Sequence, residues 1–177
     1  PGASEGLRDG SNGDGTAQVL RFGNGADPQD LDPHTVTGVP EHNIWMALFE
    51  GLLSEDPKDN HPVPGVAERW EISPDGKIYT FHLRANARWS DGTTIDAPQY
   101  VDSFQRMLSP ALAGEYSYLL WFVVGAEEFT KGTLTDFSQT GFKALDARTL
   151  QVTLKEPTPY LLKIIASHYS WSVVPIH

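Results

Sequence analysis

One stretch, residues 67–92, constrains the fold more than any other part of this 177-residue chain. Residues 69–72 and 78–83 are suited to strands, and the second run alternates apolar and polar positions, as a strand with one buried face does. Between them, residues 73–76 read Ser-Pro-Asp-Gly, where proline sets the φ that a turn needs and glycine accepts a positive φ. The stretch therefore predicts a β-hairpin. Its second strand should bury Tyr79, Phe81 and Leu83.

Composition and charge exclude several classes of partner. The net charge is −10, with 40% hydrophobic and 20% charged residues, which is ordinary for a soluble globular protein. A nucleic-acid-binding protein needs a basic surface, and an anionic membrane repels an acidic chain, so neither partner is expected. The most apolar run, residues 119–124, is too short to span a bilayer, so no membrane insertion is expected.

The chain has no cysteine. This excludes disulfides, thiolate metal sites, a cysteine nucleophile and a lipid-modified cysteine within the sequence as it stands. We recognise no signal peptide, so we expect an exported protein to be present here in a mature or trimmed form. Residues 1–17 are rich in Gly, Ser, Asn and Asp, a composition that predicts a flexible tail.

The residues before the hairpin predict a strand, a loop and a helix. Apolar residues place the strand at residues 18–23, and Asp, Pro and Gly place the loop at residues 25–37. Pro40 suits the first turn of a helix, where its missing N–H costs nothing. The apolar face of this helix should consist of Ile44, Trp45, Leu48, Phe49 and Leu52, which recur at spacings of three and four.

A second helix is predicted after the hairpin, capped by Asp96 and running to about residue 108. Gln99 stands three positions after Asp96, the spacing at which two side chains can cap each other's backbone. The buried stripe of this helix should contain Tyr100, Val101, Phe104, Met107 and Leu108.

The remaining pattern predicts two short helices, at residues 115–122 and 125–131, and a second hairpin, at residues 142–146 and 150–155. Thr158 should cap a final helix with Pro159 in its first position. The order of strands and helices predicts an α+β fold, in which helices pack on a mixed or antiparallel sheet.

Several short motifs follow one another along the chain. They are Leu-Asp-Pro-His (31–34), Gly-Val-Pro-Glu (38–41), Ser-Pro-Asp-Gly (73–76), Trp-Ser-Asp-Gly-Thr (89–93) and Val-Thr-Leu (152–154). With these motifs, residues 19–175 resemble the extracellular solute-binding proteins of the peptide-transport family, above all periplasmic oligopeptide-binding proteins. The resemblance implies a periplasmic or extracellular receptor, membrane-associated in the parent protein, which captures oligopeptides for an ABC-transporter permease. It also implies no enzymatic activity, no cofactor and no metal.

The resemblance further implies a division into domains. Members of the family are several hundred residues longer and enclose their ligand between two lobes joined by a hinge. Residues 51–168 correspond to the small inserted α+β domain, and residues 18–50 and 169–177 to part of lobe one. The groups that meet the ends of the peptide lie mostly in the second lobe. The chain alone is therefore expected to bind peptides weakly and to self-associate.

Candidate ligand-binding residues also follow from the resemblance. The segment that matches Gly38, Val39 and Pro40 lies along the cleft of the family, where main-chain groups of the matching valine pair with the extended backbone of the ligand. Tyr116 matches a tyrosine that reaches the ligand from the small domain. The spacing around it departs by one residue from that of the family, so Tyr118 remains an alternative.

Other functions remain open at this point. A protein interaction or scaffold module is one alternative, and a receptor of the same frame for nickel, murein peptide or oligosaccharide is another. Asp32 and His34 could in principle serve a hydrolase, but they stand in a proline-punctuated loop without a third partner at a suitable spacing. We therefore expect them to do no chemistry.

Overall fold

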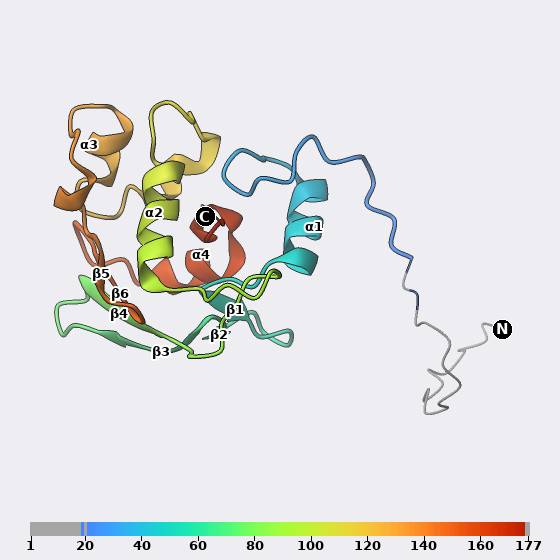
Figure 1. The fold of residues 1–177 in the computed structure, drawn as a ribbon, viewed down its shortest axis with the longest axis horizontal. Helices are drawn as coiled ribbons and strands as arrows, with labels where there is room; N and C mark the ends of the chain where they lie inside the picture. Colours follow the sequence, from blue (N-terminus) through green and yellow to red (C-terminus); the bar gives the residue numbers. More distant parts are fainter. Residues whose placement is uncertain (1–18, 20, 176–177) are drawn as a thin grey trace.

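The structure, a computed structural model, describes residue 19 and residues 21–175 of the chain (Figure 1). Its main sheet has four antiparallel strands in the order β3-β4-β6-β5. These are β3 (Ala67–Ile72), β4 (Ile78–Leu83), β5 (Phe142–Asp146) and β6 (Thr149–Thr153). The two predicted hairpins therefore join through β4 and β6 into one sheet, and the α+β class with antiparallel pairing is confirmed.

Strand β4 lies inside this sheet and carries the predicted alternation. Tyr79, Phe81 and Leu83 are at most 3% exposed, whereas the residues between them are half-buried. In the turn before the strand, Gly76 has a φ of +70°, as the Ser-Pro-Asp-Gly sequence predicts. The hairpin prediction is thus confirmed in its strands, its turn and its buried face.

Helix α2 (Ala97–Met107) packs against β5 and β6 (Figure 1). Asp96 caps it as predicted, accepting a hydrogen bond from the Gln99 N–H at 3.0 Å. The Gln99 side chain does not return this bond. It accepts one from the Trp89 indole N–H (2.9 Å) and donates one to the Thr94 carbonyl oxygen (3.2 Å). The reciprocal cap is replaced because the turn after β4 brings these partners to the start of the helix.

The main hydrophobic core lies between the sheet, α2 and the C-terminal segment. Phe104 of α2 packs on Phe142 of β5, with ring centroids 4.5 Å apart, and on Trp171, at 5.5 Å. Trp171 belongs to the 3-10 helix η3 (Tyr169–Trp171) and is 1% exposed. The last residues that the structure describes therefore help to close the core that the hairpins begin.

Short helical segments connect α2 with the second hairpin. They are η1 (Glu115–Leu120), α3 (Ala126–Thr130) and η2 (Phe137–Gln139). The first two lie where the sequence predicts short helices.

The final helix, α4 (Leu161–Ser167), packs against a small antiparallel sheet of β1 (Leu53–Glu55) and β2 (Pro62–Pro64). The predicted cap at Thr158 is wrong. The Thr158 hydroxyl donates to the Glu156 carbonyl oxygen (3.1 Å), and its own carbonyl oxygen accepts from the Leu161 N–H (3.0 Å). Thr158 thus begins a turn that precedes the helix, and the N-cap position falls to Tyr160.

Helix α1 (Val39–Leu48) is less buried than the sequence predicts. Of the apolar face expected for it, Trp45 is buried, whereas Leu48 is 66% exposed. Leu52 is buried too, but it lies beyond the end of the helix. The predicted strand at residues 18–23 lies partly outside the described residues. The described members of that range form no strand, and Val19 and Phe22 are exposed, so the prediction is wrong for them.

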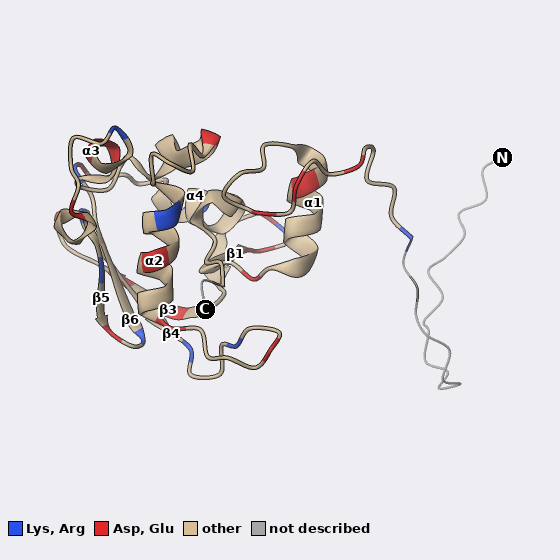
Figure 2. Ribbon diagram, turned by 45° about the horizontal axis from the view of Figure 1, so that its top comes forward, with Lys and Arg blue, Asp and Glu red and all other residues tan. Residues whose placement is uncertain are grey.

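A second, smaller hydrophobic cluster fixes α1. It consists of Val36, Trp45 and Tyr169, with Phe49 and Tyr116 packed against it. Within the described part of the chain, no helix has the length and apolar character needed to cross a membrane. In the view of Figure 2, Lys and Arg occur singly among more numerous acidic residues along the described segments.

Candidate functional site

The predicted ligand-binding residues Gly38, Val39 and Pro40 form the beginning of helix α1. Gly38 is the extended N-cap (φ −112°, ψ 162°), and Val39 is the first helical residue. The Val39 side chain is 72% exposed. Its N–H belongs to the first turn, where N–H groups have no acceptor within the helix, while its carbonyl oxygen points along the helix axis. The turn therefore presents an N–H donor beside an apolar side chain.

Tyr116 of η1 lies beside this turn. Its hydroxyl donates a hydrogen bond to the carbonyl oxygen of Thr37 at 3.2 Å, across a sequence separation of 79 positions. Its alternative, Tyr118, is 50% exposed, with its ring centroid 6.1 Å from that of Tyr116. The structure thus ties Tyr116 to Thr37, the residue directly before Gly38, so Tyr116 lies close to the other predicted ligand-binding element.

The ring of Tyr116 packs against aromatic rings that sequence reasoning did not assign to the site. Its ring centroid lies 4.8 Å from that of His168 and 5.8 Å from that of Tyr169, both in edge-on contact. Tyr169 in turn packs edge-on against Trp45 of α1, at 6.2 Å. Burial lowers the pKa of His168 to about 4, so this ring is neutral at pH 7. No local pattern predicts the group, because its members come from three separate segments.

Sequence reasoning also assigned no role to Glu41. It is the third residue of α1 and is 6% exposed. Its Oε1 accepts a hydrogen bond from the Gln29 N–H at 2.8 Å, while its buried Oε2 has no partner among the described residues. Asn24 donates to the Pro40 carbonyl oxygen at 3.1 Å. The loop before α1 is therefore tied to the first turn of the helix at two points.

Asp32 and His34 have structural partners. The Arg106 guanidinium of α2 binds both oxygens of the Asp32 carboxylate, and it donates to His34 Nδ1 at 2.9 Å. On the other side of the ring, His34 Nε2 lies 3.1 Å from the carbonyl oxygen of Ser172. Because a carbonyl only accepts and a guanidinium only donates, these contacts require the neutral ring with its proton on Nε2.

The protonation of this group follows from its surroundings. His34 is 1% exposed, and burial lowers its pKa to about 4. Burial is the largest single influence on Asp32 and raises its pKa, but the hydrogen bonds from Arg106 and the His34 N–H and the charge of Arg106 together outweigh it, so the carboxyl pKa is lowered. Both residues are thus fully engaged in joining the first loop, α2 and the C-terminal segment, and neither is placed to act on a substrate.

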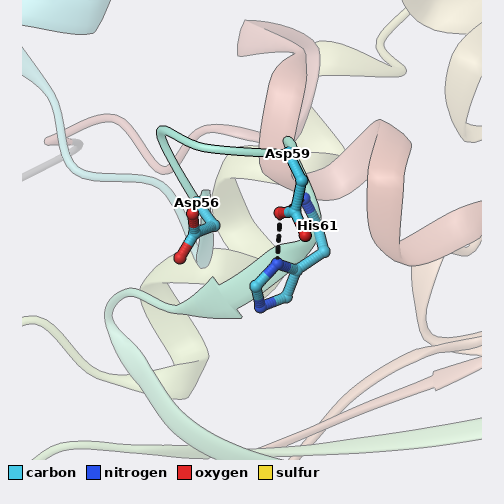
Figure 3. A group of neighbouring side chains, drawn as sticks. All are labelled: Asp56, Asp59 and His61. Carbon is cyan, nitrogen blue, oxygen red and sulfur yellow. Dashed lines mark hydrogen bonds and ion pairs between the residues drawn. The ribbon is translucent and has the colours of Figure 1, made fainter.

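Asp56, Asp59 and His61 gather in the turn between β1 and β2, with potential ligand atoms within 4.8 Å of one another (Figure 3). Hydrogen bonds of the turn account for this arrangement. Asp56 accepts from the Lys58 N–H at 2.8 Å, and Asp59 contacts His61 Nδ1 at 2.5 Å, a contact that raises the pKa of His61. Asp59 and His61 are exposed, and we assign no metal to the group.

Two cavities of the described residues lie away from the turn at Val39. One, of about 630 Å³, lies beside α2 and is lined by Asp102, Gln105 and Arg106, among others. Another, of about 510 Å³, is lined by Phe49, Arg84 and Trp89, among others. Neither includes Val39 or Tyr116. The exposed Val39 side chain thus lies on an open surface and in neither of these two cavities.

Three known proteins show what the chain is similar to. It is 48% identical over 162 residues to the periplasmic oligopeptide-binding protein OppA of Escherichia coli K12, a match that covers 89% of this chain and 29% of that protein. The crystal structure of Haemophilus influenzae OppA complexed with RPPGFSPFR aligns with a TM-score of 0.81 and 38% identity, covering 86% of this chain and 29% of that one. The Escherichia coli murein tripeptide binding protein MppA aligns with a TM-score of 0.78 and 34% identity, covering 84% and 29%.

The chain thus spans about 29% of the length of these relatives. Residues 61–175 match the middle part of the bacterial extracellular solute-binding proteins of family 5. This match covers more than half of the chain, and the sheet with its helices reproduces the fold of the relatives. The chain belongs to the bacterial extracellular solute-binding proteins, family 5.

Proposed function

We propose that this chain is part of a longer periplasmic receptor that captures oligopeptides and delivers them to the permease of an ABC transporter. The observation that carries this proposal is the hydrogen bond from Tyr116 to Thr37, the residue directly before Gly38, which supports a site shared by the two predicted ligand-binding elements. The names of the relatives support oligopeptides as the ligand class.

The proposed mechanism is reversible capture without chemistry. The Val39 N–H donates to a carbonyl oxygen of the peptide backbone, and Tyr116 limits the surface on one side. Every peptide offers the same backbone groups, so such contacts suit a receptor that accepts many side chains. A hydrolase is not supported, because Asp32 and His34 are engaged by Arg106 and Ser172.

The proposal includes the division into domains. Residues 51–168 form the small inserted domain in it, and residues 18–50 and 169–177 belong to lobe one. The separate cluster of Val36, Trp45 and Tyr169 supports a boundary between these parts. The C-terminal segment contributes to both parts, because Tyr169 lies in the smaller cluster and Trp171 in the main core.

A murein peptide is the second candidate ligand, favoured by the similarity to the murein tripeptide binding protein. Calorimetric titration of the full-length receptor with RPPGFSPFR, a murein tripeptide, nickel and an oligosaccharide distinguishes these ligands. We expect RPPGFSPFR to bind with a Kd of about 1 μM or below, which corresponds to roughly −8 kcal/mol. Binding of nickel or a sugar, without binding of either peptide, would refute the proposal. Binding of none of them would favour an interaction module.

The 177-residue chain itself should bind RPPGFSPFR weakly or not at all. A few main-chain hydrogen bonds at about 1 kcal/mol each do not offset the loss of rotational and translational freedom, which costs at least about 4 kcal/mol. Sedimentation beside calorimetry should show self-association through exposed apolar residues such as Val39 and Leu48. Micromolar binding by a monomer of this chain would show that the site is complete without a second lobe.

A further inference from the structure

The carboxylate of Glu41 is buried at the N-terminus of α1 with half of its hydrogen-bonding capacity unused. Glu41 is 6% exposed, and its Oε2 has no partner among the described residues. A buried carboxylate oxygen without a donor is costly unless another interaction stabilises it. Two features stabilise the charge here: the bond from the Gln29 N–H to Oε1, and the N-terminal end of the α1 dipole.

Gly38 is glycine because of this carboxylate. The backbone of Gly38 is extended, a conformation that any residue adopts. A Cβ added there would overlap Glu41 Oε2 and come within 3.0 Å of Glu41 Cδ. To make room, the end of the Glu41 side chain would have to shift, which would disturb the bond that its Oε1 accepts from the Gln29 N–H. The requirement for glycine is therefore one of space, imposed by a side chain three positions further on.

We propose that Glu41 is a positioning residue for ligand binding, which sets the backbone of the turn at Gly38 and Val39 by filling the space above Gly38. This inference rests on the proposed function, since it assigns to Glu41 the geometry with which Val39 meets a peptide. The loop at Gln29, the Glu41 carboxylate and the Gly38 backbone act as one packed unit. Changing any one of them should shift the Val39 N–H away from its ligand.

A double-mutant cycle tests this coupling in the full-length receptor, with RPPGFSPFR as the probe in calorimetry. Gly38→Ala and Glu41→Ala should each weaken binding about 10-fold, equivalent to roughly 1.4 kcal/mol. The double variant should bind no more weakly than Glu41→Ala alone, because the added methyl group then meets no carboxylate. Residues in direct contact show such non-additivity, whereas independent sites show additive effects.

Glu41→Gln provides the conservative rescue. It keeps the shape of the side chain and an acceptor for Gln29, so it should bind within about 3-fold of the unmodified receptor, a difference below 1 kcal/mol. A merely structural Glu41 would give parallel losses of stability and affinity. Thermal unfolding of each variant, together with hydrogen exchange at residues 37–42 without ligand, separates a positioning role of Glu41 from a merely structural one.

Each outcome has a defined meaning. Additive losses in the cycle, or a Gly38→Ala receptor that binds normally, would overturn the positioning role while leaving peptide binding intact. Failure of the unmodified receptor to bind RPPGFSPFR or any other peptide would instead overturn the proposed function, and the inference with it.

Discussion

The sheet with α2 and the N-terminal part with α1 are held in place by different kinds of interaction. In the first region, aromatic and aliphatic side chains such as Phe81 and Phe104 are completely buried against one another. In the second, three buried apolar residues are supplemented by hydrogen bonds and an ion pair, centred on His34, Asp32 and Arg106. The comparison teaches that the position of α1 depends on a few directional contacts, whereas the sheet region depends on the apolar area that its side chains bury against one another.

The two regions should therefore respond to different perturbations. Loss of apolar volume should damage the sheet region most, because the lost transfer energy and the cavity both contribute there. Loss of one polar partner, or a change of pH, should act mainly on the N-terminal region, because its remaining buried groups would be left without partners. The four predictions below test this contrast, from the largest expected effect to the smallest.

Phe81→Ala should lower the free energy of unfolding by about 3–5 kcal/mol, the usual range for truncation of a buried aromatic side chain. Phe81 is 0% exposed and lies in the central strand β4. Chemical denaturation measures the change. Ile72→Ala, on the neighbouring strand and 47% exposed, is the matched control and should cost less than about 1 kcal/mol. Equal losses for the two variants would mean that the sheet region does not depend on burial.

Acid should destabilise the N-terminal region through His34. Its pKa is lowered from 6.5 to about 4 in the folded protein, so the unfolded chain binds more protons between these values. The stability contributed by the neutral ring is fully present above pH 6.5 and is lost as the pH falls toward 4. The loss amounts to about 3 kcal/mol, since one pKa unit corresponds to 1.36 kcal/mol.

Urea unfolding at intervals between pH 7 and pH 4 measures this loss. His34→Gln, which offers a donor to Ser172 but does not titrate, should flatten part of the pH dependence. His168, whose pKa is lowered by burial too, contributes to the remaining slope in the same direction, whereas His61, whose pKa is raised, contributes in the opposite direction. An unchanged pH dependence in His34→Gln would remove His34 from the comparison.

Arg106→Met should cost about 1.5–3 kcal/mol, the range for hydrogen bonds to charged groups. The methionine keeps much of the apolar volume but leaves Asp32 and His34 without their shared donor. Arg69→Met is the matched control, because its ion pair with Glu71 is exposed and should contribute little. Hydrogen exchange should locate the loss in residues 30–36 rather than in β4; uniform faster exchange would contradict the division into two regions.

Tyr116→Phe should have the smallest effect on stability, about 0.5–1.5 kcal/mol for one hydrogen bond. It removes the bond to Thr37 while retaining the ring that packs on His168. Calorimetry should show weaker peptide binding by the full-length receptor. Tyr118→Phe should leave both properties unchanged; the opposite ranking would make Tyr118 the tyrosine of the site.

The sheet region could be predicted from the sequence more fully than the N-terminal region, because the interactions that hold the two regions differ. The hairpins and α2 are set by patterns within a few residues: the alternation around Phe81, the turn at Gly76 and the cap at Asp96. The N-terminal region depends on partners far away in sequence, such as Arg106 for Asp32 and Ser172 for His34. No local pattern contains these pairs.

The sequence-based predictions that were wrong also depended on contacts that a local pattern does not contain. The Thr158 cap failed because the residue forms a turn with Glu156 and Leu161 instead. The burial of the apolar stripe of α1 was overestimated. Periodicity shows which residues share a face of the helix but not whether another element packs on that face, and Leu48 is exposed. For the site, the resemblance supplied Gly38, Val39, Pro40 and Tyr116. It did not supply Glu41, whose role depends on the space above Gly38.

The hydrogen bonds from His34 and Trp45 to Ser172 have a consequence for the order of events during synthesis. His34 and Ser172 are 138 positions apart, and Trp45 and Ser172 are 127 apart. At about 5–20 residues per second, the ribosome needs roughly 7–28 s to add Ser172 after His34. The N-terminal segment therefore leaves the ribosome well before its partner and is open to chaperones and proteases until Ser172 follows. The sheet strands that lie between them in sequence can pair first, whereas the bond from Trp45 of α1 to Ser172 has to wait for the C-terminal segment.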